Sequence, residues 1–154
     1  MNALLLRIDA ALAAAGRMLQ PLVLLFLRLY WGWQYFLTGK GKLADLSKPT
    51  QFFTSLHIPA PAANAVFVSV TETAGGLLLM AGLGTRWFTP LFICEMLIAF
   101  VTADREALGA IFSDPDKFTG AAPFLFLLVF VILFAFGAGP LSLDALLFKK
   151  RSQP

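Results

Sequence analysis

The chain has 154 residues, of which 58% are apolar and only 14% are charged, and its mean hydropathy is +0.78. Soluble domains carry about 25% charged residues, so this composition excludes an ordinary soluble domain and is typical of an integral membrane protein. The net charge of +3 does not indicate a nucleic-acid partner. The basic residues are scattered between apolar runs and form no stripe with exposed aromatic residues.

The first residues of the chain predict an amphipathic helix that lies at the membrane surface. Their apolar positions recur at spacings of three and four residues, which places them on one helical face. The alternative is a plain extension of the first membrane span. Charges interrupt the stretch, so it lacks the apolar core of a signal peptide and is expected to stay attached. The apolar positions are Leu5, Ile8, Leu12, Ala15 and Leu19.

Four apolar runs predict membrane-spanning helices, over residues 19–38, 62–83, 87–103 and 121–138. At about 1.5 Å of rise per residue, each run approaches the roughly 30 Å hydrocarbon core of a bilayer. The predicted fold is therefore an all-α, integral membrane four-helix bundle with an N-terminal interfacial helix, in one domain over residues 1–154.

The ends of the predicted spans carry two further signals. Gly39 and Gly41 are expected to close the first span, with Lys40 and Lys42 as anchors at the interface. Only residues 82–86 join the second span to the third, so these two spans are expected to be antiparallel neighbours.

The basic residues favour cytoplasmic termini, although the signal is weak. An even number of spans puts both termini on one face, which would hold six basic residues against five on the other. The basic tail at residues 149–151 decides the choice. The first face would hold Arg7, Arg17, Arg86, Lys149, Lys150 and Arg151, and the second Lys40, Lys42, Lys48, Arg105 and Lys117.

The loop after the first span contains apolar residues that a wholly solvated loop would not need. One hypothesis is that they form a lid over the outer mouth of the bundle, and the alternative is ordinary packing of a loop on a bundle. The residues are Phe52, Phe53, Leu56 and Ile58.

A single cysteine, Cys94, and a single histidine, His57, limit the redox chemistry that the chain can perform alone. A disulfide relay, a CxxC motif, an iron–sulfur cluster and a two-histidine haem site are excluded within one chain. No metal site is expected. The neighbours of Cys94 are apolar, which favours an inert buried thiol.

Three ionisable residues, Arg28, Glu72 and Glu95, lie in the middle of predicted spans. Each costs about 2.5–3.5 kcal/mol at the centre of a membrane helix, so three together need a reason. Counted from the predicted inner ends of the spans, all three lie roughly 12–17 Å deep. They are therefore expected to meet in one layer.

Arg28 and Glu72 are the first-choice pair, because a forked guanidinium suits a carboxylate. Gly32 shares the helix face of Arg28, while Gly75 and Gly76 share that of Glu72. Small residues of this kind let two membrane helices approach closely, so these glycines are assigned to packing. The alternative for the pair is an ion pair that only fixes the helix register.

One cation facing two carboxylates leaves a surplus negative charge, so one carboxyl is expected to hold a proton near neutral pH. Glu95 is the candidate if Glu72 pairs with Arg28. Both glutamates are candidate catalytic residues for proton transfer. For Glu95, the alternative is a protonated, hydrogen-bonded carboxyl of the core.

A flat ligand is a further hypothesis for this region. Trp31 and Tyr35 are one turn from Arg28 and from each other, and they are candidates to wall a ligand whose oxygen accepts a hydrogen bond from Arg28. A quinone head group fits that description. Tyr35 is alternatively a residue of the interfacial aromatic belt.

Five segments in this order resemble the DoxX family of small four-helix membrane proteins, over about residues 28–144: RLYWGWQYFLTGKGKL, FFTSLHIPAP, TETAGGLLLMAGLGTR, EMLIAFVTADRE and FGAGPLSLD. Recurring family residues match Arg28, Gly32, Gly39 and Lys42, then Glu72 and Gly75, and finally Gly137, Gly139, Ser142, Leu143 and Asp144.

The resemblance implies a bacterial or archaeal protein of the cytoplasmic (inner) membrane that is associated with an oxidoreductase. The family is named for a subunit linked to thiosulfate:quinone oxidoreductase, and other members are described as partners in membrane oxidoreductase assemblies. The expected partners are the lipid bilayer and either a larger oxidoreductase complex or further copies of the chain.

Three functions are therefore considered. The first is a quinone-interacting subunit of a membrane oxidoreductase. The second is a non-catalytic accessory or scaffold protein of a respiratory or stress-defence complex. The third is a small carrier or proton path, which the lack of a broken-helix repeat disfavours. A soluble enzyme is not supported, because the chain has no phosphate loop and no nucleophile elbow.

Overall fold

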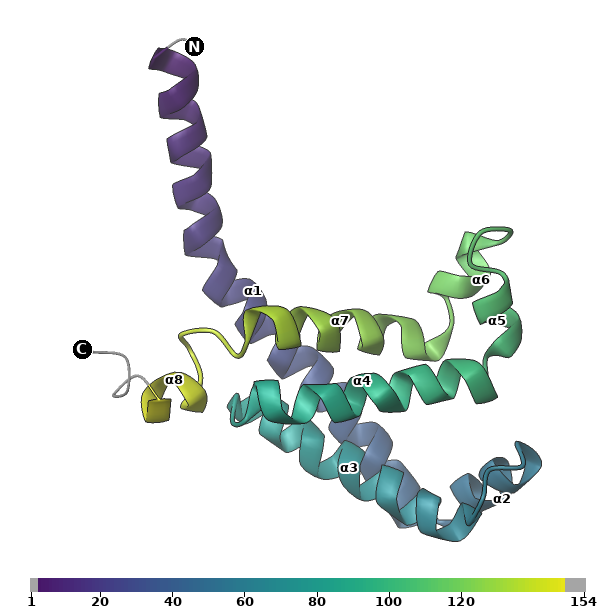
Figure 1. Cartoon of the computed structure of the whole chain (residues 1–154). Coiled ribbons are helices and arrows are strands. Elements are labelled where there is room, and N and C mark those ends of the chain that lie inside the picture. The colour runs from purple at the N-terminus through teal and green to yellow at the C-terminus, as the bar shows by residue number, and fades with distance from the viewer. Residues whose placement is uncertain (1–2, 149–154) are drawn as a thin grey trace.

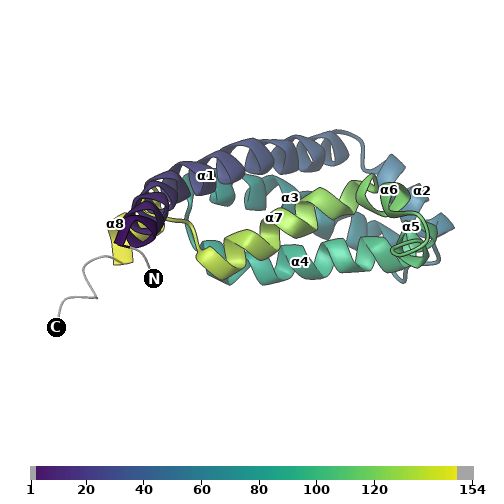
Figure 2. The same cartoon turned by 90° about the horizontal axis from the view of Figure 1, so that it is seen from above.

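The computed structural model describes residues 3–148, and every regular element in this range is an α-helix. Helices α1, α3, α4 and α7 form a bundle, with α2, α5 and α6 at one end and α8 at the other (Figure 1, Figure 2). The predicted all-α membrane bundle is confirmed. The helices are α1 (Ala3–Ala44), α2 (Ser47–Ser55), α3 (Pro61–Ala81), α4 (Thr85–Thr102), α5 (Arg105–Gly109), α6 (Pro115–Thr119), α7 (Ala122–Phe136) and α8 (Leu143–Phe148).

Three helices, α1, α3 and α4, are long and apolar enough to cross a membrane. Helix α7 is also apolar but has 15 residues, or about 22 Å of helix. It ends before Gly137, which has a φ of 75° and interrupts the predicted run 121–138. The number of membrane passes therefore stays a prediction. The basic tail at residues 149–151 lies outside the described residues.

Helix α1 joins the predicted interfacial helix and the predicted first span into one helix of 42 residues. At about 1.5 Å per residue it is about 63 Å long, or about twice the thickness of the hydrocarbon core. Its first turns project beyond the bundle (Figure 1), and residues 4–13 are exposed. The predicted break at Gly39 and Gly41 is wrong, because α1 continues to Ala44 along α3.

Helices α1 and α3 form the most extensive helix pair, and glycine permits their close approach. A Cβ on Gly76 would lie 2.5 Å from the carbonyl oxygen of Gly32, and a Cβ on Gly32 would lie 3.0 Å from that of Gly76. Backbones that approach this closely are typical of small-residue contacts between membrane helices. The same contacts set the antiparallel register, with Gly82 beside Arg28 and Gly39 beside Glu72.

We expect Gly76→Ala to lower the stability of the bundle by about 1–3 kcal/mol, because the added methyl would strike backbone atoms of α1. Gly41→Ala is the matched control. Nothing lies within 4 Å of a Cβ at Gly41, and alanine is the better helix former. Thermal unfolding of both variants in one detergent checks the expectation, and equal unfolding temperatures would contradict it.

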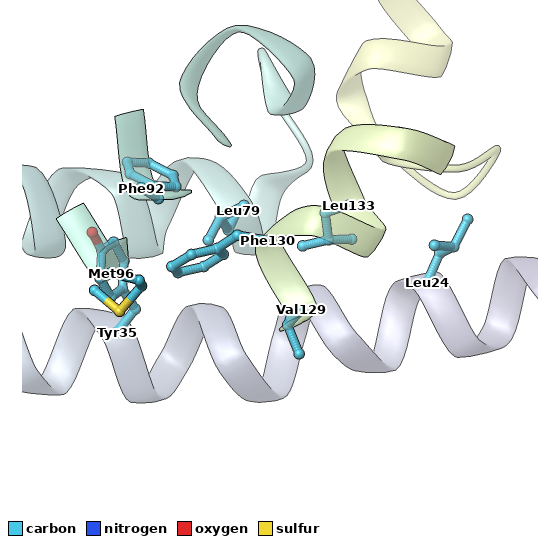
Figure 3. Packing of buried hydrophobic residues seen from close by; sticks show 8 residues of the cluster. All are labelled: Leu24, Tyr35, Leu79, Phe92, Met96, Val129, Phe130 and Leu133. Atoms are coloured by element: carbon cyan, nitrogen blue, oxygen red, sulfur yellow. The ribbon is translucent and has the colours of Figure 1, made fainter. Parts of the chain in front are cut away.

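The core lies between the α1–α3 pair and the α4–α7 pair. Phe130 of α7 is fully buried, and its ring centroid lies 5.1 Å from that of Tyr35 and 5.3 Å from that of Phe92. Figure 3 shows Leu24 at the opposite end of this cluster from Tyr35. The core thus holds α1, α4 and α7 together along most of the bundle.

Helix α4 packs mainly on α7 rather than on α3. Only residues 82–84 separate α3 from α4, yet the two helices diverge from this turn toward the end that carries α2 (Figure 1). Helices α3 and α4, which the short connection predicts to be antiparallel neighbours, therefore contact each other mainly near the turn. Farther along, a space remains between them.

Candidate functional site

Arg28 is buried, with an exposed fraction of 1%, but it does not pair with Glu72. Its guanidinium donates hydrogen bonds to the carbonyl oxygens of Ala138 and Leu141, at 2.7 and 2.6 Å. Both carbonyls belong to the segment between α7 and α8. The predicted Arg28–Glu72 ion pair is therefore wrong.

The register of α1 against α3 explains this correction. Gly82 lies opposite Arg28, and Gly82 is ten residues beyond Glu72, since 82 − 72 = 10. Ten residues of helix correspond to about 15 Å. The two charges therefore lie at different depths, because the predicted span ends did not match the register that the glycine contacts impose.

Asp144 holds the same end of the bundle as Arg28. Its carboxylate accepts hydrogen bonds from the backbone N–H groups of Gly84 and Thr85, at 2.7 and 3.0 Å. These two N–H groups lie at the N-terminus of α4, where a carboxylate is favoured. Arg28 and Asp144 together tie the C-terminal segment to α1 and to the α3–α4 turn, which is a structural arrangement.

Glu72 pairs with Lys42 of α1 instead, with 2.5 Å between Lys42 Nζ and Glu72 Oε1. The Glu72 side chain is 4% exposed and that of Lys42 is 29% exposed. Sequence reasoning missed this pair because it placed Lys42 at the interface, beyond the end of the helix. A signal was present, since one face of α1 carries residues at spacings of four and three: Arg28, Gly32, Tyr35, Gly39 and Lys42.

Glu95 of α4 lies beside Glu72. The Tyr35 hydroxyl donates a hydrogen bond to Glu95 Oε2 at 2.6 Å, and Glu72 and Glu95 line the same space between α3 and α4. Glu72 Oε2 is buried, and no donor from residues 3–148 reaches it. Lys42, Glu72, Glu95 and Tyr35 thus form a connected set, here called the polar chain.

The polar chain contains one ammonium group and two carboxyl groups, so the charge imbalance expected from the sequence persists with Lys42 in the place of Arg28. A proton held between Glu72 and Glu95 would balance the charge and provide Glu72 Oε2 with a donor. The arrangement can therefore store and transfer a proton.

A cavity of about 240 Å³, here called the α3–α4 cavity, lies beside the polar chain where α3 and α4 diverge. Lys42, Glu72 and Glu95 line it. Its rim includes residues whose side chains are also exposed on the outer surface of the bundle, so the cavity opens sideways toward the acyl chains of a bilayer. These rim residues are Phe67, Leu91 and Ile98.

The residues predicted to form a lid all line the α3–α4 cavity at the end that carries α2: Phe52, Phe53, Leu56 and Ile58. Cys94 lines the cavity as well and is exposed, so the expectation of a buried thiol is wrong. The side chain of Cys94 lies on the outward-facing side of α4, together with those of Leu91 and Ile98.

Arg28, Trp31 and Tyr35 are not among the residues that line the cavity. Trp31 packs edge-on against Phe126 of α7, with 5.1 Å between ring centroids. The ring of Tyr35 lies in the core, and its hydroxyl donates a hydrogen bond to Glu95 without lining the cavity. Tyr35 is thus brought to a predicted catalytic residue, whereas Lys42 takes the position of a cation that had been assigned to Arg28.

Residues 3–148 contain no group of three or more His, Cys, Asp or Glu side chains that could hold a metal ion. The polar chain itself consists of an amine, two carboxyl groups and a phenol.

The sequence profile of the DoxX family matches residues 23–105. The chain belongs to the DoxX family. A curated relative, named "Putative oxidoreductase CatD", from Bacillus subtilis (strain 168), is 32% identical over 127 residues, which are 81% of this chain and 87% of the relative. No solved structure matches the chain. The DoxX match includes all four residues of the polar chain.

The family match and the relative together place this protein among the DoxX membrane proteins. Its long apolar helices imply a lipid bilayer as its surroundings. It is therefore a DoxX membrane protein with a polar chain next to a cavity that opens toward lipid.

Proposed function

We propose that this DoxX protein is a membrane subunit of an oxidoreductase and binds a quinone head group in the α3–α4 cavity. It lies in the cytoplasmic (inner) membrane of a bacterium, with both termini in the cytoplasm. The observation that carries the proposal is the lining of that cavity, in which Lys42, a hydrogen-bond donor, lies with Glu72 and Glu95 among apolar side chains. Glu72 Oε2 is buried and no donor from residues 3–148 reaches it. Leaving such an atom unpaired costs about 1–3 kcal/mol, so a proton is favoured there.

The size and the lining of the cavity suit a single ring. Its volume of about 240 Å³ is below the roughly 300–1,000 Å³ of pockets that enclose a whole drug-sized ligand. A ring fits inside, and an isoprenoid tail can leave between Phe67 and Ile98 into the acyl chains. Lys42 at one side of the ring provides the donor that a quinone oxygen needs.

A bound quinone supplies a group that accepts two electrons and two protons. In this protein, Lys42 donates a hydrogen bond to a ring oxygen, and Glu72 and Glu95 hold one of the two protons that the ring needs, while the second comes from water. Tyr35 orients Glu95 through its 2.6 Å hydrogen bond. The electrons come from a partner subunit, which agrees with the single cysteine and single histidine of the chain.

A non-catalytic accessory protein is the second candidate, because Phe112 between α5 and α6 is 93% exposed at the end of the bundle, where a partner protein could cover it. In that case the polar chain only holds the helices together. Glu72→Gln would then lower only the amount of protein in the membrane and leave the turnover per protein molecule unchanged, whereas a role in quinone chemistry predicts lost turnover per molecule.

Ala99→Phe is expected to weaken the binding of decylubiquinone at least about tenfold, or about 1.4 kcal/mol, because Ala99 lines the cavity and a phenyl ring would fill it. Ala74→Phe is the matched control, since Ala74 of α3 is exposed and lies outside the cavity. Calorimetric titration of both purified variants checks the expectation. Wild-type affinity in Ala99→Phe would exclude this cavity as the binding site.

Cys94 provides an independent report of where the quinone binds, because this single thiol lines the cavity. Bound decylubiquinone should slow the labelling of Cys94 by a lipid-soluble maleimide. Unchanged labelling at a quinone concentration that saturates the calorimetric signal would place the quinone elsewhere in the protein.

A further inference from the structure

Lys42 lies between two separate spaces. One is the α3–α4 cavity, and the other is a groove of about 440 Å³ between α1 and α2, here called the α2 groove. Among residues 3–148, Lys42 is the one charged residue that lines both. Its ammonium group contacts Glu72 on the cavity side, and its side chain is partly exposed. Lys42 therefore joins the carboxyl pair to the surface at the end that carries α2.

The α2 groove is open to water. Asp45 and Lys48 line it and have side chains that are 44% and 82% exposed, with 3.5 Å between their charged atoms. The hydroxyl of Ser47 donates a hydrogen bond to Asp45 and holds the pKa of that carboxyl below its usual value. Asp45 is therefore ionised at neutral pH, and a fixed negative charge raises the local concentration of protons.

The opposite side of the carboxyl pair is closed by apolar packing. Rings of Tyr35, Phe92 and Phe130 pack on one another in the core (Figure 3), where the Tyr35 hydroxyl contacts Glu95. Leu79 and Leu133 continue this layer. Among the described residues, the charged groups around Lys42 are Glu72 of α3, Glu95 of α4, and Asp45 and Lys48 beside the groove.

We propose that Lys42 conducts protons between the α2 groove and the Glu72–Glu95 pair, so that the site exchanges protons with the aqueous face at the α2 end of the bundle. This inference rests on the proposed function, because it specifies the proton route of the same site.

The transfer is a pair of proton steps that balance. An N–H bond of the Lys42 ammonium group breaks and an O–H bond forms on Glu72, which leaves a neutral amine and a neutral carboxyl. The amine then takes a proton from a hydronium ion in the α2 groove and releases water. One proton has moved from the groove to Glu72, and Lys42 has returned to its charged form.

Infrared spectroscopy of the full-length protein in liposomes tests this route. After transfer from H₂O to D₂O, the C=O stretching band of the protonated carboxyl shifts as its proton exchanges, and its loss in Glu95→Gln assigns the band. Lys42→Arg should slow the exchange at least about tenfold, because a guanidinium keeps the positive charge beside Glu72 but does not release a proton. Lys48→Arg is the control and should exchange at the wild-type rate.

Gly41→Leu is a second test that leaves Lys42 in place. Gly41 lines the α2 groove, and nothing lies within 4 Å of a Cβ built on it, so a leucine there obstructs the groove without straining α1. Exchange should slow severalfold. Wild-type exchange rates in both Lys42→Arg and Gly41→Leu would overturn the proposal, as would a wild-type spectrum without a protonated-carboxyl band.

The two proposals can fail separately. Ala99→Phe blocks the cavity but not the groove, so its exchange rate should equal that of the wild type while its affinity for decylubiquinone falls. Conversely, Gly41→Leu should retain binding of decylubiquinone while its exchange slows, because Gly41 lines the α2 groove and not the α3–α4 cavity. A wild-type protein that exchanges quickly through Lys42 but binds no decylubiquinone would contradict only the quinone proposal.

Discussion

Arg28→Ala is expected to lower the free energy of unfolding by about 3–5 kcal/mol, since it removes a buried cation and both of its hydrogen bonds. The carbonyl oxygens of Ala138 and Leu141 would lose their donors at 2.7 and 2.6 Å. The deleted guanidinium would also leave a void next to Gly82. Chemical unfolding in one detergent measures the loss.

Arg86→Ala is the matched control for Arg28→Ala. Arg86 also donates to a carbonyl oxygen, that of Ala135 at 3.1 Å, but it is exposed. Its removal should change stability by about 0.5 kcal/mol or less. Arg28→Ala should in addition speed proteolytic cleavage between α7 and α8, because this segment would no longer be held. Similar stabilities of the two variants would show that Arg28 does not hold the C-terminal segment.

Lys42→Met is expected to lower the free energy of unfolding by about 3–5 kcal/mol, because it leaves the buried Glu72 carboxylate without Lys42 Nζ, which lies 2.5 Å from Glu72 Oε1. The double variant Lys42→Met/Glu72→Gln should recover part of this loss, since a neutral amide costs less to bury than a carboxylate. The expected coupling between the two sites is about 1–3 kcal/mol. Unfolding of the wild type, both single variants and the double variant completes the cycle.

Lys48→Met provides the comparison with a solvated ion pair. Lys48 and Asp45 are 3.5 Å apart and largely exposed, so breaking this pair should cost about 0–1 kcal/mol. If the effects of Lys42→Met and Glu72→Gln simply added, the two residues would not form a stabilising contact, and the first link of the polar chain would be removed.

The bundle itself could be predicted from the sequence because long apolar runs have few alternatives to helices in a membrane. The runs at 62–83 and 87–103 lie close to α3 (Pro61–Ala81) and α4 (Thr85–Thr102). The end of α1 was harder to predict. Gly39 and Gly41 predict a helix end when only local preference is considered, but α3 packs along this part of α1 and keeps it helical.

The identity of the charged residues in the interior was predictable, but their partners were not. Burial of Arg28 and Glu72 follows from their positions in apolar runs. Their partners depend on the register between α1 and α3, and an error of a few residues in a span end shifts the depth of a side chain by several ångströms. The contact between Gly32 and Gly76 sets this register, and it forms only in three dimensions.

The sideways opening of the α3–α4 cavity determines how affinity for this protein has to be expressed. Phe67 and Ile98 line the cavity and are also exposed on the outer surface of the bundle, so a ligand that enters on this side comes from the bilayer, where an isoprenoid compound partitions almost completely. Occupancy then depends on the mole fraction of the compound among the lipids and not on its concentration in the buffer. Adding lipid at constant protein and ligand should therefore empty the cavity by dilution alone, and detergent micelles should act in the same way.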